Sequence, residues 1–380
     1  MMGEILKHVL SSEVRVVKIG EREIGPGKPC FIIAEAGVNH NGDVELAEKL
    51  IYAAAEAGAD AVKFQTFKAE QVTTKHSPTA AYQKKNVGED NQWNLLRPLE
   101  LKDDAYPRLI DACRKAGIMF LSTPHGFINS AKLLEPLVPA WKVGSGDLTD
   151  LPFLKWLGES GKPIILATGM ATIEEIKEAI ATIEATGNKN TVILHCTTNY
   201  PCPDEEANVS AMLDIQANFP EYPIGFSDHT LGIDADVLAA GLGSVMIEKH
   251  FTLDRNMPGP DQKNSLEPKE LAEMVQQVRK IQSLTPEEKE SMLSRMPRVT
   301  TLMGTGKKIP FPSETVIAEM TRKAVIAQND IPAGTIITGE MITIKRPAKG
   351  GLHPRELEKI IGKVAKRDIQ ADTQIQATDF

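Results

Sequence analysis

The sequence predicts an α/β protein in which a (βα)₈ barrel, or TIM barrel, is followed by a small β-rich domain. Three observations lead to this fold class. β-rich runs and helical patterns alternate strictly, which is typical of a parallel sheet. Eight such units occupy roughly 250 residues, the usual size of a closed barrel. After these units, the pattern changes to a short repeat of β-rich segments.

The predicted strands extend from Phe31 to Phe251, and helical patterns lie between them. The strands are expected at Phe31–Glu35, Ala61–Thr66, Ile118–Thr123, Trp141–Ser145, Pro163–Thr168, Thr191–Thr197, Pro223–Ser227 and Val245–Phe251. The helices include Val44–Glu56, Asp103–Ala116, Ile173–Thr186 and Pro268–Gln282. An open doubly wound sheet is the competing fold. It would carry a dinucleotide turn after the first strand, and Ala36–Gly42 lacks the G-x-G-x-x-G spacing of such a turn.

Two further segments are expected at the ends of the barrel. Lys18–Lys28 contains three glycines and predicts a short hairpin that closes the barrel floor. Phe67–Leu101 is the one long connection, between the second strand and its helix. Because a loop of this length at the strand ends of a barrel enzyme usually shapes the substrate pocket, we expect it to line the site.

The chain divides into a barrel with its hairpin (1–283), a linker (284–313) and a second domain (314–380). Thr285-Pro286-Glu287-Glu288 is a capping-box start for a short helix within the linker. In the last part, Ala327–Thr335 weakly resembles Ala365–Thr373. Two copies of a small β unit predict a compact domain.

The composition limits the possible partners. With 43 basic and 51 acidic residues, the net charge is -8, which gives no general attraction to nucleic acid or to an anionic membrane. There is no stretch of 18 apolar residues, and Met1–His8 lacks the pattern of an export signal, so a soluble cytoplasmic protein is expected. The four cysteines fit no zinc spacing and predict buried or loop thiols: Cys30, Cys113, Cys196 and Cys202.

Two histidines lie near the ends of the last two predicted strands. Side chains alternate along a strand, so Ser227 and His229 share one face, and Glu248 and His250 share one face of the neighbouring strand. A histidine pair among oxygen-bearing groups suits a divalent transition metal with open coordination positions. The alternative is two unrelated histidines whose ring nitrogens bind backbone groups.

Lysines and hydroxyl groups at the other strand ends point to an anionic ligand. A buried lysine without a partner is costly, and Glu35, Asp147 and Glu248 are the carboxylates available to pair with Lys63 and Lys142. The hydroxyl donors are Thr123, Ser145, Thr168, Thr198 and Ser227. Such donors suit a phosphate or a carboxylate, so a phosphorylated substrate is expected.

Two other classes of function use the same residues. A barrel aldolase would form a Schiff base on Lys63 or Lys142, although that chemistry needs no histidine pair. Borohydride trapping would label only the aldolase. A non-catalytic sugar-binding protein would show no turnover with metal and phosphorylated substrates.

Four motifs resemble one known family: Ala34–Gly42, Val62–Thr66, Gly225–Thr230 and Ile247–Phe251. From about Lys18 onward the chain is similar to the N-acetylneuraminate (sialic acid) synthases, a family that includes the legionaminic acid synthases. Pro310–Phe380 resembles the antifreeze-like (SAF) domain of that family. The resemblance implies condensation of phosphoenolpyruvate with an N-acylated mannosamine-type sugar, such as N-acetylmannosamine, which yields phosphate and a nine-carbon 2-keto acid.

The resemblance also implies roles for individual residues. Phosphoenolpyruvate would be held by Lys63, Thr123, Lys142, Ser145, Thr168, Thr198 and Ser227. Mn²⁺ or Mg²⁺ would bind His229 and His250, and the sugar would meet Gln65, Tyr200, Asp261 and Arg346. Glu35 and Glu248 are the candidates for acid–base work on the aldehyde and on water. Thr168 and Thr198 replace the Ser and Asn of the family pattern, and both keep a hydrogen-bond donor.

Two further features of the sequence bear on the acceptor sugar and on the oligomeric assembly. The loop Lys75–Leu101 is closer to legionaminic acid synthases than to sialic acid synthases, so a 2,4-diacetamido-6-deoxy sugar is the alternative acceptor. Arg346 lies in the small domain, far along the chain from the barrel motifs. A linker of about thirty residues can span tens of ångströms, which predicts a domain-swapped homodimer in which each small domain caps the partner's barrel.

Overall fold

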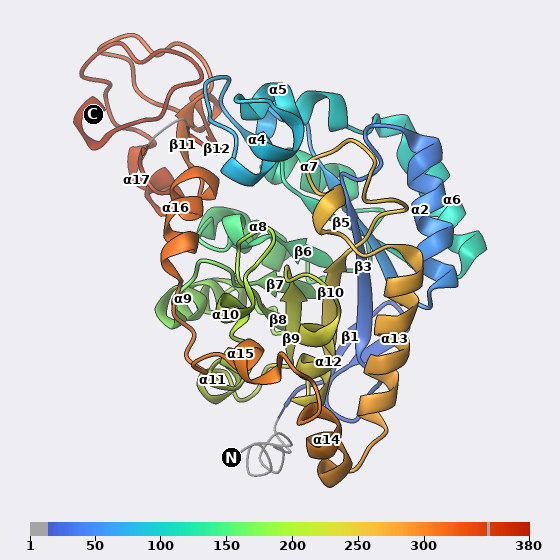
Figure 1. Ribbon diagram of the computed structural model, residues 1–380. Helices are drawn as coiled ribbons and strands as arrows, with labels where there is room; N and C mark the ends of the chain where they lie inside the picture. Colours follow the sequence, from blue (N-terminus) through green and yellow to red (C-terminus); the bar gives the residue numbers. More distant parts are fainter. Residues whose placement is uncertain (1–13, 348–349) are drawn as a thin grey trace.

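The computed structural model describes residues 14–347 and 350–380. The start of the chain, where the sequence predicts no export signal, lies outside this part. Within it, eight parallel strands form one sheet in the order β5-β4-β3-β10-β9-β8-β7-β6. These are β3 Phe31–Gly37, β4 Ala61–Thr66, β5 Met119–Pro124, β6 Trp141–Val143, β7 Ile164–Ala167, β8 Thr191–His195, β9 Ile224–Asp228 and β10 Met246–His250. Because β5 and β6 also lie side by side, the sheet curls into a nearly closed barrel, which confirms the predicted fold (Figure 1).

A helix follows each strand and packs on the outside of the barrel (Figure 1). These helices are α2 Val44–Glu56, α6 Tyr106–Ala116, α7 Phe127–Leu134, α8 Leu151–Glu159, α9 Ile173–Glu184, α11 Ala211–Asn218, α12 Asp234–Gly241 and α13 Pro268–Gln282, with the short α10 Asp204–Ala207 before α11. Capping hydrogen bonds help to fix where these helices begin. At α9, for example, Thr172 accepts a hydrogen bond from the Glu175 N–H while the Glu175 side chain caps Thr172.

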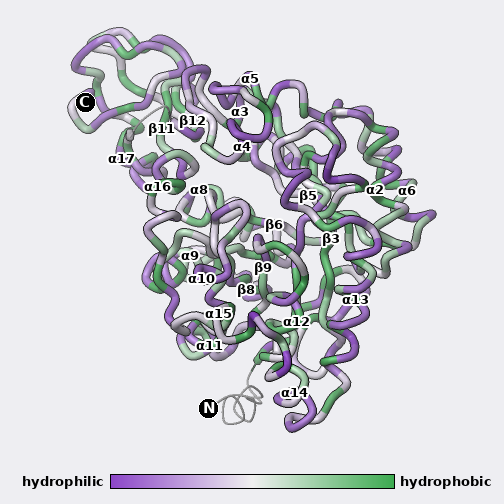
Figure 2. The backbone as a smooth tube through the Cα atoms, in the orientation of Figure 1, coloured by the Kyte–Doolittle hydropathy of each residue, from purple (hydrophilic) through white to green (hydrophobic). Residues whose placement is uncertain are grey.

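Apolar periodicity decides which face of each helix is buried. In α13, Leu271, Met274 and Val278 recur at helical spacing and are buried against the barrel. The strands are buried on both faces, as expected for a parallel sheet covered by helices. Figure 2 shows this arrangement, with apolar colouring along the central strands and alternating colours in the surrounding helices.

The hairpin expected before the first strand is present. Strands β1 Val17–Ile19 and β2 Arg22–Ile24 pair antiparallel. Val17, Ile19 and Ile24 are buried in one cluster with interior residues of the barrel strands, including Phe31 and Leu121. The hairpin therefore closes the barrel floor, as predicted, and leaves the opposite end for the site.

The long connection after β4 and the segment after α13 are both folded. The first contains α3 Ala69–Val72, α4 Ala81–Val87 and α5 Gln92–Leu96. The second contains α14 Pro286–Leu293, α15 Val299–Met303 and α16 Pro312–Thr321. Leu293, Val299 and Leu302 are buried in the main core, so most of the segment expected as a linker packs against the barrel. The helix predicted from the capping box at Thr285 is α14.

In the small domain, the two repeat copies pair with each other. Its strands β11 Ala324–Ala327 and β12 Ile342–Lys345 pair antiparallel, and α17 Leu357–Ile360 follows. Ile331 and Ile369 exchange two backbone hydrogen bonds of 2.9 Å. Asp330 accepts from the Ala371 N–H, and Asp368 accepts from the Ala333 N–H, both at 2.8 Å. Equivalent residues of the repeat thus bind each other about a local two-fold axis.

The small domain lies over the carboxyl ends of the strands in its own chain. The Arg346 N–H donates to the Val72 carbonyl (2.8 Å), and the Arg346 carbonyl accepts from the Thr74 N–H (3.1 Å). Exchange of the small domain between two chains would preserve the same contacts, so the domain-swapped homodimer stays a prediction. In the part of the chain that the structure describes, no helix is long and apolar enough to cross a membrane, and the four cysteines are buried and free, as expected.

Candidate active site

The residues singled out from the sequence converge on one cavity of about 160 Å³ at the carboxyl ends of the barrel strands. Fourteen of the fifteen line it: Glu35, Lys63, Gln65, Thr123, Lys142, Ser145, Thr198, Tyr200, Ser227, His229, Glu248, His250, Asp261 and Arg346. The exception is Thr168, whose hydroxyl donates to the Leu194 carbonyl at 2.9 Å instead. The strands position most of these side chains because all eight end at the same rim, while Arg346 reaches the cavity from β12.

Two lysines and two carboxylates form a buried cluster in the cavity wall. Lys63 Nζ lies 2.6 Å from Glu35 Oε2 and 3.8 Å from Glu248 Oε1. Lys142 Nζ lies 3.6 Å from Glu248 Oε1. All four side chains are at most 8% exposed. The charges sum to zero, so the cluster is tolerable in a low-dielectric site and can still respond to an added anion.

The pKa values of these four side chains are shifted in different directions. Burial raises the pKa of Glu35 in spite of the nearby Lys63. For Glu248, burial alone would raise the pKa, but Lys142 and Lys63 outweigh it and hold the pKa below its usual value. Burial lowers the pKa of Lys142, whereas for Lys63 the carboxylates Glu248 and Glu35 overcome burial and raise the pKa. Opposite shifts in two neighbouring carboxyl groups are typical of acid–base sites.

The two histidines meet beside this cluster. β9 and β10 are neighbours, and the ring centroids of His229 and His250 lie 5.6 Å apart. His229 Nδ1 lies 2.7 Å from the Thr197 carbonyl. Since a carbonyl only accepts, Nδ1 must carry the hydrogen, which leaves the Nε2 lone pair free for a metal ion.

The donor set fits a divalent metal with open positions. Burial lowers the pKa of His229 and that of His250, so both rings are neutral, as metal ligands must be. Among residues 14–347 and 350–380, no group of three or more His, Cys, Asp or Glu is arranged to enclose a metal ion. Two histidines and substrate or water oxygens would therefore complete the shell, in contrast to a closed structural site.

Hydroxyl donors surround the lysine side of the cavity. Thr123 accepts from Lys63 Nζ at 3.1 Å, and Ser227 donates to Glu248 Oε1 at 3.3 Å. Ser145 accepts from the Gly169 N–H at 3.0 Å, while Thr198 Oγ1 is buried without a hydrogen-bond partner among the described residues. A buried hydroxyl without a partner in such a cluster indicates a position for a ligand oxygen.

The other side of the cavity combines polar groups with aromatic rings. Asp261 Oδ1 and Arg346 Nε are buried without hydrogen-bond partners among the described residues. Gln65 Nε2 donates to Glu35 Oε1 at 3.2 Å. Tyr200 stacks on Tyr82 at 5.0 Å and packs against His229 at 4.2 Å between ring centroids. This half can hold a polyhydroxylated ligand against an aromatic face.

The structure corrects one pairing and adds residues that the sequence did not indicate. Asp147 pairs with Lys323 at 2.7 Å and approaches His125 at 3.6 Å, and it makes no ion pair with Lys63 or Lys142. The reason is that the turn at 145–147 after β6 carries Asp147 toward the small domain. The missed cavity residues include Tyr82, Gln83, Gln92, His125, Met170 and an apolar group from the long loop, Phe67, Val72, Leu95, Leu96 and Leu99. Only the length of that loop signalled its role.

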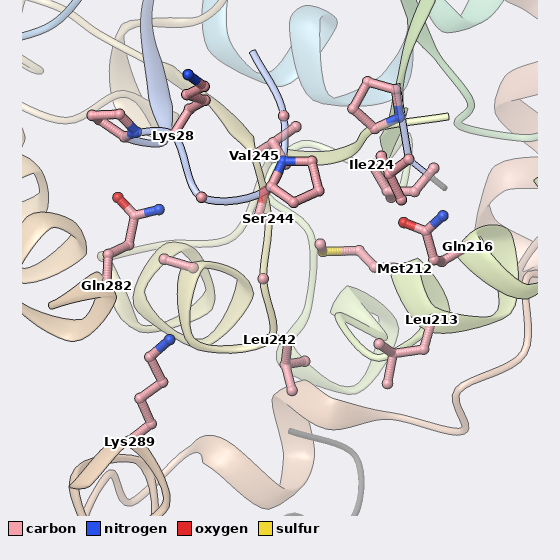
Figure 3. A pocket seen from close by; sticks show the side chains of 18 of the residues that line it. Lys28, Met212, Leu213, Gln216, Ile224, Leu242, Ser244, Val245, Gln282 and Lys289 are labelled. Atoms are coloured by element: carbon pink, nitrogen blue, oxygen red, sulfur yellow. The ribbon is translucent and has the colours of Figure 1, made fainter. Parts of the chain in front are cut away.

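A larger cavity of about 1000 Å³ lies at the opposite end of the barrel, near the starts of β9 and β10 (Figure 3). Apolar side chains such as Met212, Leu213 and Leu242 line much of it. Two of its three cations have structural partners: Arg279 pairs with Asp60 at 2.7 Å, and Lys28 pairs with Glu23 at 2.5 Å. None of the expected functional residues lines this cavity. The chemistry is therefore assigned to the smaller cavity, at the end where barrel enzymes place their sites.

Comparison with known proteins gives a consistent result. The NeuB family matches residues 50–290, and the SAF domain matches residues 322–380. The chain is 42% identical, over 92% of its length, to the N,N'-diacetyllegionaminic acid synthase of Campylobacter jejuni, of which 99% is covered. It is 33% identical, over 93% of its length, to the N-acetylneuraminate-9-phosphate synthase of Homo sapiens, of which 93% is covered.

A solved structure supports the same assignment. The spore coat polysaccharide biosynthesis protein SpsE of Bacillus subtilis superposes with a TM-score of 0.81 at 37% identity, covering 96% of this chain and 99% of that one. Fold, site and similarity therefore agree: the chain belongs to the NeuB family of sialic and legionaminic acid synthases, and it ends in a SAF domain.

Proposed function

We propose that this protein condenses phosphoenolpyruvate with an N-acylated mannosamine-type sugar and water, giving phosphate and a nine-carbon 2-keto acid. The observation that carries the proposal is one cavity with two different halves. Lys63, Lys142 and the hydroxyl donors suit a phosphate and a carboxylate. Asp261, Arg346 and the aromatic rings suit a sugar. The histidine pair, whose ring centroids lie 5.6 Å apart, lines the same cavity as Glu248.

The positions of Glu35 and Glu248 suit them to two different proton transfers. Glu35 is bonded to Gln65, on the sugar side, so it would deliver a proton to the aldehyde oxygen as the enol carbon attacks. Glu248 is bonded to Ser227 and lies near Lys142, on the anion side. It would take a proton from the water that adds to carbon two, after which the phosphate leaves with its bridging oxygen. Lys63 and Lys142 would stabilise the anionic groups throughout.

His229 and His250 would hold Mn²⁺ or Mg²⁺, which when bound supplies Lewis-acid polarisation of the acceptor aldehyde. The protein's own contribution at this point is orientation. The Thr197 carbonyl fixes the His229 tautomer, and Tyr200 packs against the His229 ring.

For the acceptor, we infer a 2,4-diacetamido-6-deoxy sugar of the legionaminic acid type in preference to N-acetylmannosamine. Two observations support this choice. Identity is higher to the legionaminic acid synthase of Campylobacter jejuni (42%) than to the human N-acetylneuraminate-9-phosphate synthase (33%). In addition, the long loop contributes an apolar wall, Phe67, Val72, Leu95, Leu96 and Leu99. Such a wall suits methyl groups better than a free hydroxymethyl group.

Turnover of the two acceptors with phosphoenolpyruvate and Mn²⁺ tests the proposal. A preference of about tenfold or more in kcat/KM, or about 1.4 kcal/mol, is expected for the deoxy sugar. Val72→Thr should reduce that preference because it places a hydroxyl in the wall, whereas Val87→Thr, at an exposed site on α4, should not. Equal turnover would refute the acceptor assignment.

An isotope experiment tests the reaction itself. Phosphoenolpyruvate labelled with ¹⁸O at the bridging oxygen should yield labelled phosphate, and the new carbonyl oxygen of the product should come from solvent. Retention of the label in the keto acid would show cleavage of the phosphorus–oxygen bond and refute addition of water at carbon two.

A further inference from the structure

One buried carboxylate near the cavity has no role in the reaction described above. Glu314, on α16, is 1% exposed although it lies in the segment between the barrel and the small domain. One of its oxygens, Oε1, accepts from the Met170 N–H at 2.7 Å and from the Thr198 N–H at 2.8 Å. The other, Oε2, accepts from the Phe311 N–H at 3.0 Å and caps its own helix. The first pair of bonds joins α16 to two loops of the barrel.

Those two loops carry part of the anion side of the cavity. Met170 follows β7 and Gly169, and Thr198 follows β8. The Gly169 N–H donates to Ser145 Oγ, and a Cβ at Gly169 would lie only 2.0 Å from Thr198 Oγ1 and 2.8 Å from Ser145 Oγ. The hydroxyls are thus packed tightly around this glycine. A small movement of either loop would displace groups that are placed to meet a ligand oxygen.

The backbone at Met170 needs external support. Its φ is 63°, in the left-handed region that L residues with a side chain rarely adopt. Glu314 binds its N–H, and Arg322 Nη2 donates to its carbonyl at 2.9 Å. Arg322 is held in turn by Glu175, with contacts of 2.7 and 2.8 Å. Both polar groups of the strained residue are therefore bound by the segment that leads into the small domain.

A helix cap alone does not account for this arrangement. Capping α16 requires only Oε2 and the Phe311 N–H. Oε1 instead bonds to donors 144 and 116 residues away in sequence, in two different loops. Hydrogen bonds that backbone N–H groups donate to a carboxylate are among the stronger hydrogen bonds in proteins.

We propose that Glu314 is a positioning residue, assisted by Arg322, which holds the loops after β7 and β8 in the geometry that binds the phosphate of phosphoenolpyruvate. The inference rests on the proposed function. It adds that the affinity for phosphoenolpyruvate depends on the docking of α16, and hence that the segment leading into the small domain controls one substrate as well as carrying Arg346 to the other.

The test measures phosphoenolpyruvate binding by calorimetry without an acceptor, on the full-length protein and three variants. Glu314→Ala leaves two buried N–H groups without a partner and should raise the Kd about tenfold or more, a change of about 1.4 kcal/mol. Glu314→Gln keeps an acceptor oxygen of the same shape and should raise it less. Glu319→Ala, at an exposed position of the same helix, is the matched control and should leave it unchanged. In kinetics, KM for phosphoenolpyruvate should rise in Glu314→Ala while KM for the acceptor does not.

Distinct outcomes would overturn the inference. These are an unchanged Kd in Glu314→Ala, or KM values for both substrates that rise together in proportion to a loss of thermal stability. If Glu314→Ala does not fold, Arg322→Ala decides, because this side chain is about a third exposed and its loss still frees the Met170 carbonyl. An unchanged Kd in that variant would refute the positioning role of Glu314 and Arg322. If the unaltered protein binds no phosphoenolpyruvate, the proposed function fails, and this inference fails with it.

Discussion

Asp261 provides a direct test of how the site balances binding against stability. The residue follows β10, is 7% exposed, and its Oδ1 has no hydrogen-bond partner among the described residues. Burial, followed by the nearby Glu35, raises the pKa of its carboxyl to about 7. The substitution Asp261→Asn keeps the shape of the side chain and removes the titration.

The size of the effect follows from linkage. The unfolded chain has an Asp pKa of about 3.9, so the folded state keeps a proton over roughly three pH units in which the unfolded state has lost it. Stability contributed by the protonated carboxyl is therefore complete below about pH 4 and is lost as pH rises toward 7. At about 1.36 kcal/mol per unit, the ionised side chain costs about 4 kcal/mol at pH 8. Asp261→Asn removes this cost.

Urea unfolding at pH 4.5 and pH 8 measures the effect. We expect Asp261→Asn to be close to the unaltered protein at pH 4.5 and more stable by up to about 4 kcal/mol at pH 8. The matched control is Asp104→Asn, which makes the same chemical change at an exposed position outside the cavity. The variant should also lose affinity for the acceptor sugar. An Asp261→Asn protein that is equally stable, or less stable, at pH 8 would refute the reasoning.

Three further predictions concern the metal, the lysines and the assembly. Treatment with EDTA should abolish activity, and added Mn²⁺ should restore activity and give a binding signal in electron paramagnetic resonance. His229→Ala and His250→Ala should lose both the activity and the Mn²⁺ signal. Full activity after EDTA treatment would show that the reaction needs no metal. Borohydride added with substrate should label neither Lys63 nor Lys142, and a covalent adduct would favour the aldolase alternative. Homodimers of Arg346→Ala and of His250→Ala should both be inactive. If the small domains are exchanged between chains, doubly tagged mixed dimers should regain activity, because one site then carries no lesion; inactive mixed dimers would show that Arg346 serves its own barrel.

The barrel was predictable because local signals and the global fold agree. Strand–helix alternation is visible in short windows, and the ends of parallel strands must meet at one rim. This rule alone brings Glu35, Lys63 and His250 together from distant parts of the sequence. The hairpin was also predictable from a local signal, because three glycines within Lys18–Lys28 favour turns.

The residues that escaped prediction lie outside the barrel strands, where no strand periodicity fixes the direction of a side chain. Asp147 was expected beside the lysines, but the turn after β6 directs it to Lys323 of the small domain. His125 reaches the cavity from the turn after β5, and Tyr82 reaches it from α4. Glu314 reads in the sequence as an ordinary acidic residue in the first turn of a helix, and only the packing of α16 on the barrel buries it. Thr168 directly follows β7 but does not line the cavity, and its hydroxyl donates to the Leu194 carbonyl.

The pairing of the two repeat copies has a consequence for the order in which the enzyme is made. β11 binds segments at the very end of the chain, as shown by the bonds from the Ile375 N–H to Val325 and from the Ala327 N–H to Thr373. At about 5–20 residues per second, a ribosome needs roughly 3 to 11 s to add the residues after β11. The barrel can fold during synthesis, but the small domain cannot close until the segment up to Ile375 emerges. Arg346 therefore reaches its place only after this segment is made, so that a product truncated before it would hold an open cavity and no complete sugar site.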